Sequence, residues 1–160
     1  MSYFRETRCL ENSIIDYLTT SFNADWSDVD VVKTFKEVYS NTLTVPIVCV
    51  RVINDTNRRR ELGANTLWVE YDVMIDIFAR SDSQRLDLAD YVKDKLKDGC
   101  TYYTYSHASG DKETLETTAA GDVFMLRINT NGRVELYTDD LDPKDRYRHS
   151  MSITFRVSLS

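Results

Sequence analysis

Histidine, cysteine and glycine are scarce in this sequence, which has two, three and five of them among 160 residues. Cys9, Cys49 and Cys100 are odd in number and lack the close spacing of metal ligands. We therefore expect reduced, mostly structural thiols, as in a cytosolic protein, and neither a metal site nor a cofactor. A glycine-rich phosphate-binding loop is also missing from the pattern, which leaves no recognisable catalytic or cofactor-binding residue.

Long apolar runs and clustered basic residues are missing as well. No apolar stretch approaches the length of a membrane span, and the first residues, MSYFRETRCLENS, contain no apolar signal core. We therefore expect a protein that is neither secreted nor embedded in a membrane. The formal net charge is −6 and no basic face is evident, which argues against a dedicated nucleic-acid-binding protein.

The apolar fraction of 42% in 160 residues predicts one globular domain, residues 1–160, with a single core. Its clearest pattern is a strand expected from Leu67 to Ala79, whose side chains alternate between two faces. One face is apolar and belongs in a core. The other combines three carboxylates with three large apolar groups, a mixture that often meets another subunit. The residues of this mixed face are Trp68, Glu70, Asp72, Met74, Asp76 and Phe78.

Two amphipathic helices are expected. The first runs from about Phe4 to Ser21 and buries a stripe at spacing three to four. The second begins at Ser81, which fits a capping box with Gln84, and ends near Gly99, where a left-handed cap is favoured. The buried stripes are Leu10, Ile14, Tyr17 and Leu18 in the first helix, and Leu88, Ala89, Val92 and Leu96 in the second.

Several further segments read as strands and loops. Pro46 opens IVCVRVI, which is typical of a strand buried on both faces. Residues 25–30 fit either a short strand or a helical turn. CTYYTYS, residues 100–106, is a strand candidate, whereas residues 54–65 and 108–121 are expected to be polar loops. Residues 139–146 form a charged connector, and an alternating strand from Tyr147 to Leu159 is expected to pair with the strand from Leu67.

A hairpin is expected over Val123–Tyr137. Its apolar pattern favours a three-residue turn through Thr130, Asn131 and Gly132, with Gly132 in the left-handed region. Together these elements predict an α+β fold, in which two main helices flank a largely antiparallel sheet.

Three groups of residues are candidates for function. Glu70, Asp72 and Asp76 share a strand face and could hold Mg²⁺ or transfer protons, but pairing with Arg148 and Arg156 on a neighbouring strand is the favoured interpretation. The other two groups are candidates for a subunit or partner interface, together with Trp68, Met74 and Phe78. They are the loop arginines Arg58, Arg59 and Arg60, and the tyrosines Tyr102, Tyr103 and Tyr105. For both, the alternative is an ordinary solvated loop or packed edge strand.

Residues 61–96 resemble the tail terminator and neck (head–tail completion) proteins of long-tailed bacteriophages. The shared features are a strand of the form VxIxIFA, a short polar break and a helix of the form RLDLADxVxxxL, preceded by the strand PIVCVRV. The resemblance is good from about Pro46 to Lys97 and looser in the last strand. It implies a small α+β subunit of the virion, without enzymatic activity or cofactor.

The resemblance also implies partners. Proteins of this family form rings, here expected to contain six subunits, that cap the tail tube and join it to the head connector or stopper protein. Genomic DNA passes through the lumen without specific binding, and a net negative charge suits that passage. The expected location is the neck of the virion, after assembly in the host cytoplasm. Two alternatives remain: another neck component (connector adaptor or stopper), and a small metal-dependent hydrolase.

Overall fold

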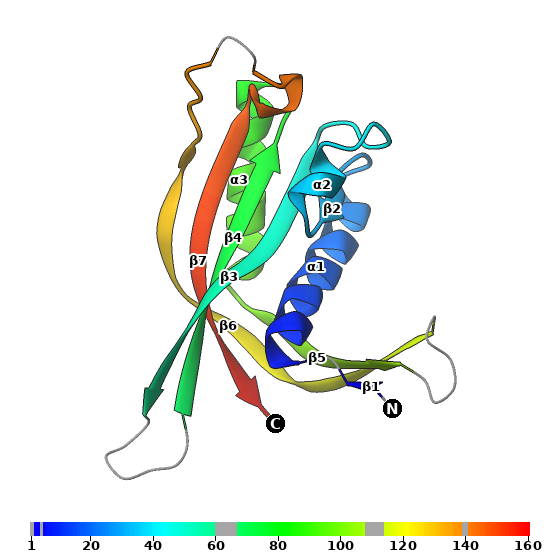
Figure 1. Cartoon of the computed structure of the whole chain (residues 1–160), viewed down its shortest axis with the longest axis vertical. Coiled ribbons are helices and arrows are strands. Elements are labelled where there is room, and N and C mark those ends of the chain that lie inside the picture. The colour runs from blue at the N-terminus through cyan, green and yellow to red at the C-terminus, as the bar shows by residue number, and fades with distance from the viewer. Residues whose placement is uncertain (1, 4, 60–66, 108–113, 139–140) are drawn as a thin grey trace.

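A single twisted sheet forms the centre of the protein. In the computed structural model, residues 2–3, 5–59, 67–107, 114–138 and 141–160 are described, and among them seven strands pair in the order β1-β5-β6-β7-β4-β3-β2 (Figure 1). The strands are β1 (Ser2–Tyr3), β2 (Asp30–Val32), β3 (Ile47–Arg59), β4 (Leu67–Phe78), β5 (Cys100–His107), β6 (Leu115–Arg133) and β7 (Arg148–Leu159). Only β2 and β3 pair in parallel in this part of the chain, so the predicted α+β fold with a largely antiparallel sheet is confirmed.

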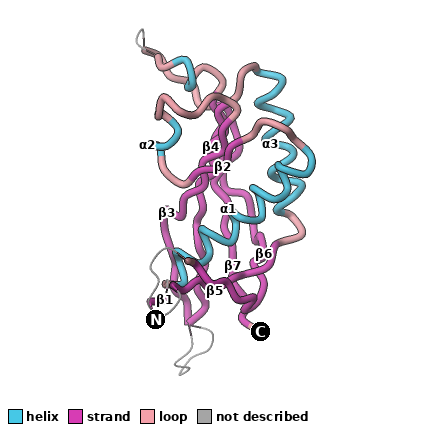
Figure 2. Tube along the Cα trace, turned by 90° about the vertical axis from the view of Figure 1, so that its right-hand side faces the viewer, coloured by secondary structure: helices cyan, strands magenta, loops and turns pink. Residues whose placement is uncertain are grey.

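Two long helices, α1 (Glu6–Asp25) and α3 (Asp82–Leu96), lie against the same face of the sheet (Figure 2). The predicted stripes of both helices face this sheet, and in α1 the side chains of Leu10, Ile14 and Leu18 are fully buried. Burying such side chains is worth roughly 2 kcal/mol each, so this helix-covered face is the main source of stability. The short helix α2 (Phe35–Val38) and a 3₁₀ turn at Pro143–Asp145 lie outside this core.

The ends of α3 follow the predicted capping with one difference. The Ser81 hydroxyl accepts the backbone N–H of Gln84 at 3.1 Å, as a capping box requires. The Gln84 side chain, however, accepts the N–H of Arg80 at 2.8 Å, one residue before the cap. Gly99 has φ 78°, and a Cβ there would lie 2.3 Å from the Val123 carbonyl oxygen, so this position needs glycine.

Strands β4 and β7 pair side by side in the middle of the sheet, as predicted. Val73 lies opposite Ile153 and Ile77 opposite His149, so the apolar faces of both strands meet under the helices. The start of β3 is also as predicted, because residues 47–50 are fully buried on both faces of the sheet. Residues 25–30, for which the sequence left two possibilities open, include the start of the short strand β2 at Asp30.

The polar loop predicted for residues 54–65 is wrong in its first half, because β3 continues to Arg59. After an irregularity between Val52 and Asn54, this extension pairs with the first half of β4, ending with Arg59 opposite Leu67. Residues 54–57 are exposed, and therefore lack the apolar alternation from which a buried strand is recognised. Backbone pairing with β4 holds the extension in place instead. Residues 60–66 lie outside the described part of the chain.

The predicted hairpin is also wrong, and so is the end of the loop predicted for residues 108–121. Residues 115–133 form one continuous strand, β6, which pairs first with β5 and then with β7. Gly132 lies opposite Ser150, and among the described residues only Gly99 and Gly121 have positive φ. The distant strand β7 offers a long pairing partner, and its ladder outweighs the local turn preference of Asn131-Gly132.

Candidate interaction surface

The face of the sheet that points away from α1 and α3 is here called the outer face. It carries the mixed side chains of β4, as predicted, together with their neighbours on β3, β6 and β7. One end lies next to α2 and contains Asp76, Phe78, Arg51, Arg148 and Phe35; we call it the α2 end. The other, called the open end, contains Trp68, Glu70, Phe124, Arg127 and Arg156.

At the α2 end, a buried carboxylate is enclosed by two arginines. Asp76 is 1% exposed and accepts hydrogen bonds from Arg51 Nη2 at 3.1 Å and Arg148 Nη2 at 3.0 Å. The guanidinium carbons lie 3.8 Å and 4.9 Å from the centre of the Phe35 ring, so both cations also lie over an aromatic face. These contacts close the α2 end within one chain.

At the open end, Glu70 binds two arginines that reach toward solvent. Its two carboxylate oxygens lie 3.3 Å from Arg156 Nη2 and 3.4 Å from Arg127 Nη1. The guanidinium carbon of Arg156 lies 4.3 Å from the centre of the Trp68 ring. The predicted ion pairs Glu70–Arg156 and Asp76–Arg148 are therefore confirmed. Between the two ends, Asp72 accepts a hydrogen bond from the Thr154 hydroxyl at 2.6 Å instead of pairing with an arginine.

Large apolar side chains are exposed at the open end. Trp68 is 42% exposed, and Phe124, which lies opposite Arg156, is 44% exposed. Tryptophan and arginine side by side are typical of the residues that contribute most to protein–protein binding. The open end therefore combines the side chains from which a protein interface is usually built.

The residues predicted for an interface are distributed over the molecule. Trp68 lies at the open end, Met74 is partly buried and accepts the Ser150 hydroxyl at 3.0 Å, and Phe78 is fully buried against Phe35 and Tyr39 of the same chain. Phe78 is therefore covered by its own chain, without a neighbouring subunit.

The arginines and tyrosines lie elsewhere. Arg58 and Arg59 end β3, where only the backbone is described, and Arg60 lies outside the described residues. Tyr102 and Tyr105 are 2% and 3% exposed beneath α1, whereas Tyr103 is half-buried. Of the three tyrosines, only Tyr103 presents a substantial surface.

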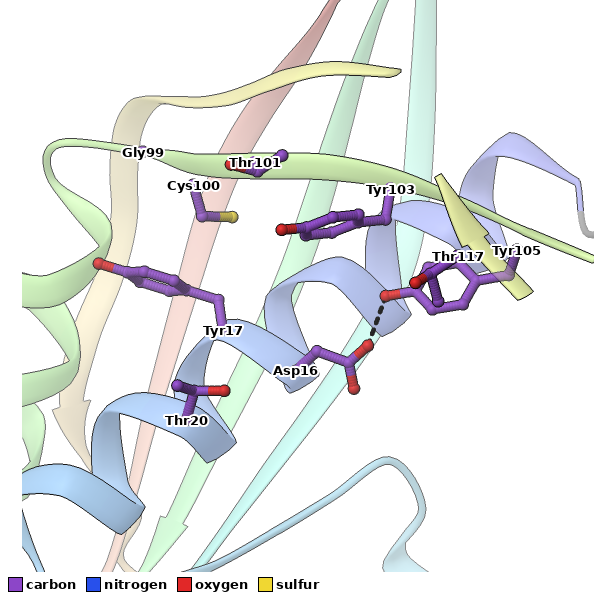
Figure 3. Close-up of a pocket in the computed structure, with 9 residues that line it drawn as sticks. All are labelled: Asp16, Tyr17, Thr20, Gly99, Cys100, Thr101, Tyr103, Tyr105 and Thr117. Carbon is purple, nitrogen blue, oxygen red and sulfur yellow. Dashed lines mark hydrogen bonds between the residues drawn. The ribbon is translucent and has the colours of Figure 1, made fainter. Parts of the chain in front are cut away.

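A groove of about 560 Å³ lies between α1 and β5 (Figure 3). Tyr17, Tyr103 and Tyr105 contribute aromatic rings and Asp16 a carboxylate. The remaining lining residues are Thr20, Gly99, Cys100, Thr101 and Thr117. Burial, and then the charge of Asp122, raise the pKa of the Cys100 thiol to about 12, so this cysteine remains protonated and unreactive at neutral pH.

The described residues include one buried histidine, His149, and no cluster of possible metal ligands. His149 is 4% exposed, with Arg85 Nη1 2.6 Å from its Nδ1 and Asn131 Oδ1 2.5 Å from its Nε2. Burial, followed by the Arg85 charge, lowers the pKa of His149, so the neutral ring accepts from Arg85 and donates to Asn131.

Sequence reasoning missed two parts of these surfaces. The sequence pattern places Phe124 and Arg127 in a hairpin. Only the pairing of β6 with β7 brings Arg127 to Glu70 and sets Phe124 opposite Arg156, which lies over Trp68. The sequence pattern places Asp16 and Tyr17 in a helix, and no sequence spacing links them to Tyr103.

Comparison with known proteins does not assign the chain to a family. No protein-family model matches the sequence, and a search of curated proteins found no match. In the described chain, no helix is both long and apolar enough to cross a membrane.

Proposed function

We propose that this protein is a structural subunit of a bacteriophage virion that forms a ring at the head–tail junction. The ring ends the growing tail tube and joins it to the head connector. The proposal rests on the resemblance of residues 61–96 to tail terminator and neck proteins. The resemblance implies an α+β subunit with helices on a largely antiparallel sheet, and the fold is compatible with it.

The observation that carries the assembly part of the proposal is the open end of the outer face. Trp68 and Phe124 are each more than 40% exposed there and flank Arg156, which lies opposite Phe124 in the sheet. Burying a large apolar side chain is worth roughly 2 kcal/mol, so these side chains would contribute substantially to a contact with a neighbour. A head-to-tail contact of this kind closes into a ring when the rotation between subunits is right.

The test is to mix the protein with polymerising tail-tube protein from the same virus and to measure tube lengths and tube ends by electron microscopy. We expect short tubes that carry ring-shaped density at one end. The ring is expected to form on the tube, so a monomer in free solution is compatible with the proposal. Tubes of unrestricted length without extra end density would contradict the terminator role and favour a neck component nearer the head.

A pair of variants links this assay to the open end. Replacing Trp68 and Phe124 together by alanine should reduce the fraction of capped tubes about tenfold or more, because about 2 kcal/mol per side chain is lost from the contact. Leu86→Ala is the matched control, since Leu86 is 48% exposed on α3, away from the outer face. If the double variant still caps tubes, the contact with the neighbour must lie on another surface.

A further inference from the structure

The segment that follows β6 leaves large apolar side chains in water. It runs from the end of β6 through the 3₁₀ turn, residues 133–146, and is here called the acidic segment; residues 139 and 140 lie outside the described part of the chain. Tyr137 is 91% exposed and Leu136 is 40% exposed, and both line a groove of about 350 Å³. Apolar side chains gathered at a hollow are typical of a surface that binds another protein.

The charge of the acidic segment is negative. Its sequence contains five carboxylates and three basic residues, Arg133, Lys144 and Arg146. Two of these bases are engaged within the chain. The Lys144 ammonium group donates to three backbone carbonyl oxygens at and after the end of α2, and Arg133 Nη1 lies 3.7 Å from Asp82 Oδ1. The carboxylate of Glu135 lies next to the exposed ring and accepts the Tyr137 hydroxyl at 2.7 Å.

The open end of the outer face has the complementary composition. Two arginines bind one carboxylate there, Glu70, and one of them, Arg127, is 53% exposed beside the exposed aromatic rings. The two surfaces are far apart within one chain. Figure 1 shows the acidic segment at one end of the sheet and the start of β4, which carries Trp68, at the other. Only a second copy can bring them together.

We propose that the open end of one copy binds the acidic segment of a second copy. The Tyr137 ring offers an aromatic face to the guanidinium groups of Arg127 and Arg156, and the carboxylates of the segment balance their charge. Because two different surfaces meet, the contact is head-to-tail, as a ring requires. The inference rests on the proposed function, since it names the part of the neighbouring subunit that the open end contacts.

Other occupants suit the open end less well. Two open ends facing each other would bring four arginines together with two carboxylates, so their like charges would disfavour the contact. Double-stranded DNA would offer phosphates to the arginines, but it would leave the exposed rings of Trp68 and Phe124 without an apolar partner. The acidic segment supplies both negative charge and apolar surface.

The test uses the full-length chain with Tyr137 replaced by p-benzoylphenylalanine, an aromatic residue that forms covalent bonds to its neighbours under near-ultraviolet light. The chain is irradiated alone at high concentration and together with polymerising tail-tube protein, and crosslinked peptides are identified by mass spectrometry. We expect crosslinks between two copies, in peptides that contain Trp68 or Phe124. The same photoreactive residue in place of Leu86, which is exposed on α3, is the matched control and should not crosslink to these peptides.

The outcomes separate this contact from the ring itself. Crosslinks to tail-tube protein alone, or none between copies in either mixture, would overturn the contact. Capped tubes without the expected crosslinks would therefore contradict this inference and leave the proposed function standing. Tubes of unrestricted length, with the expected crosslinks in the protein alone, would support the contact and contradict the terminator role.

A pair of complementary chains guards against a damaged fold. The first carries the photoreactive residue together with Trp68→Ala and Phe124→Ala, and its crosslinks should fall about tenfold. The second carries Leu136→Ala and Tyr137→Ala and keeps its open end. Adding the second chain should restore the crosslinks, because it supplies an intact open end. No recovery, or equal recovery with a second chain whose open end is also altered, would overturn the proposal.

Discussion

The two ends of the outer face contain the same arrangement, a strand carboxylate between two arginines, in different surroundings. The Asp76 side chain is 1% exposed and its partner Arg148 is 17% exposed, because α2 and its aromatic residues cover them. At the open end, Glu70 is 10% exposed but its partner Arg127 is 53% exposed, and Trp68 lies at the surface. One end is thus completed by its own chain, whereas the other has the exposed composition of an interface.

The comparison predicts the largest difference for the aromatic residues of the two ends. Phe78→Ala should lower the free energy of unfolding by about 3–5 kcal/mol, because it leaves a cavity among Phe35, Tyr39 and the fully buried Val38. Unfolding in urea, followed by circular dichroism, measures this change.

Trp68→Ala is the matched change at the open end. It should alter the free energy of unfolding by about 1 kcal/mol or less, because the ring is 42% exposed in the isolated chain. If Phe78→Ala and Trp68→Ala lower the free energy of unfolding equally, the α2 end and the open end do not differ in how far their own chain covers them.

A smaller difference is expected for the carboxylates. Asp76→Asn should lower the free energy of unfolding by about 3 kcal/mol, because Arg51 and Arg148 then share a covered site without a compensating negative charge. Glu70→Gln should cost about 1 kcal/mol or less, because Arg127 and Arg156 turn to solvent. Thermal unfolding at low and at high salt measures the stability loss in both variants. A greater loss in Glu70→Gln than in Asp76→Asn would contradict the view that the α2 end is covered and the open end exposed.

The smallest effect is expected in β6. Gly132→Val should change the free energy of unfolding by less than about 0.5 kcal/mol, because Gly132 has no positive φ and an added Cβ meets nothing within 4 Å. This reverses the effect expected for a hairpin turn at this residue. In Gly121→Ala, by contrast, the new Cβ would lie 2.0 Å from the Ser158 carbonyl oxygen, so a clear loss is expected. A loss in Gly132→Val similar to that in Gly121→Ala would contradict the continuous strand.

The elements that the sequence predicted correctly are those with a strong periodic pattern and a buried face. α1, α3, β4 and β7 all alternate or repeat against one core, so each pattern is complete within its own segment. The end of β3 and the start of β6 have no such pattern, since their side chains are largely exposed. The groove escaped prediction for a related reason: Asp16 and Tyr103 are far apart in the sequence and line one groove only because α1 packs on β5.

The sequence by itself determined the α+β composition, the buried stripes, and the pairing of Glu70 and Asp76 with arginines of the last strand, because these follow from short periods in hydrophobicity and charge. Only the tertiary structure decided that residues 115–133 form one strand, since the partner that stabilises it, β7, comes later in the chain. It also decided which aromatic residues are covered. α2 encloses Phe78, whereas Trp68, ten residues earlier on the same strand face, lies beyond its reach and stays exposed.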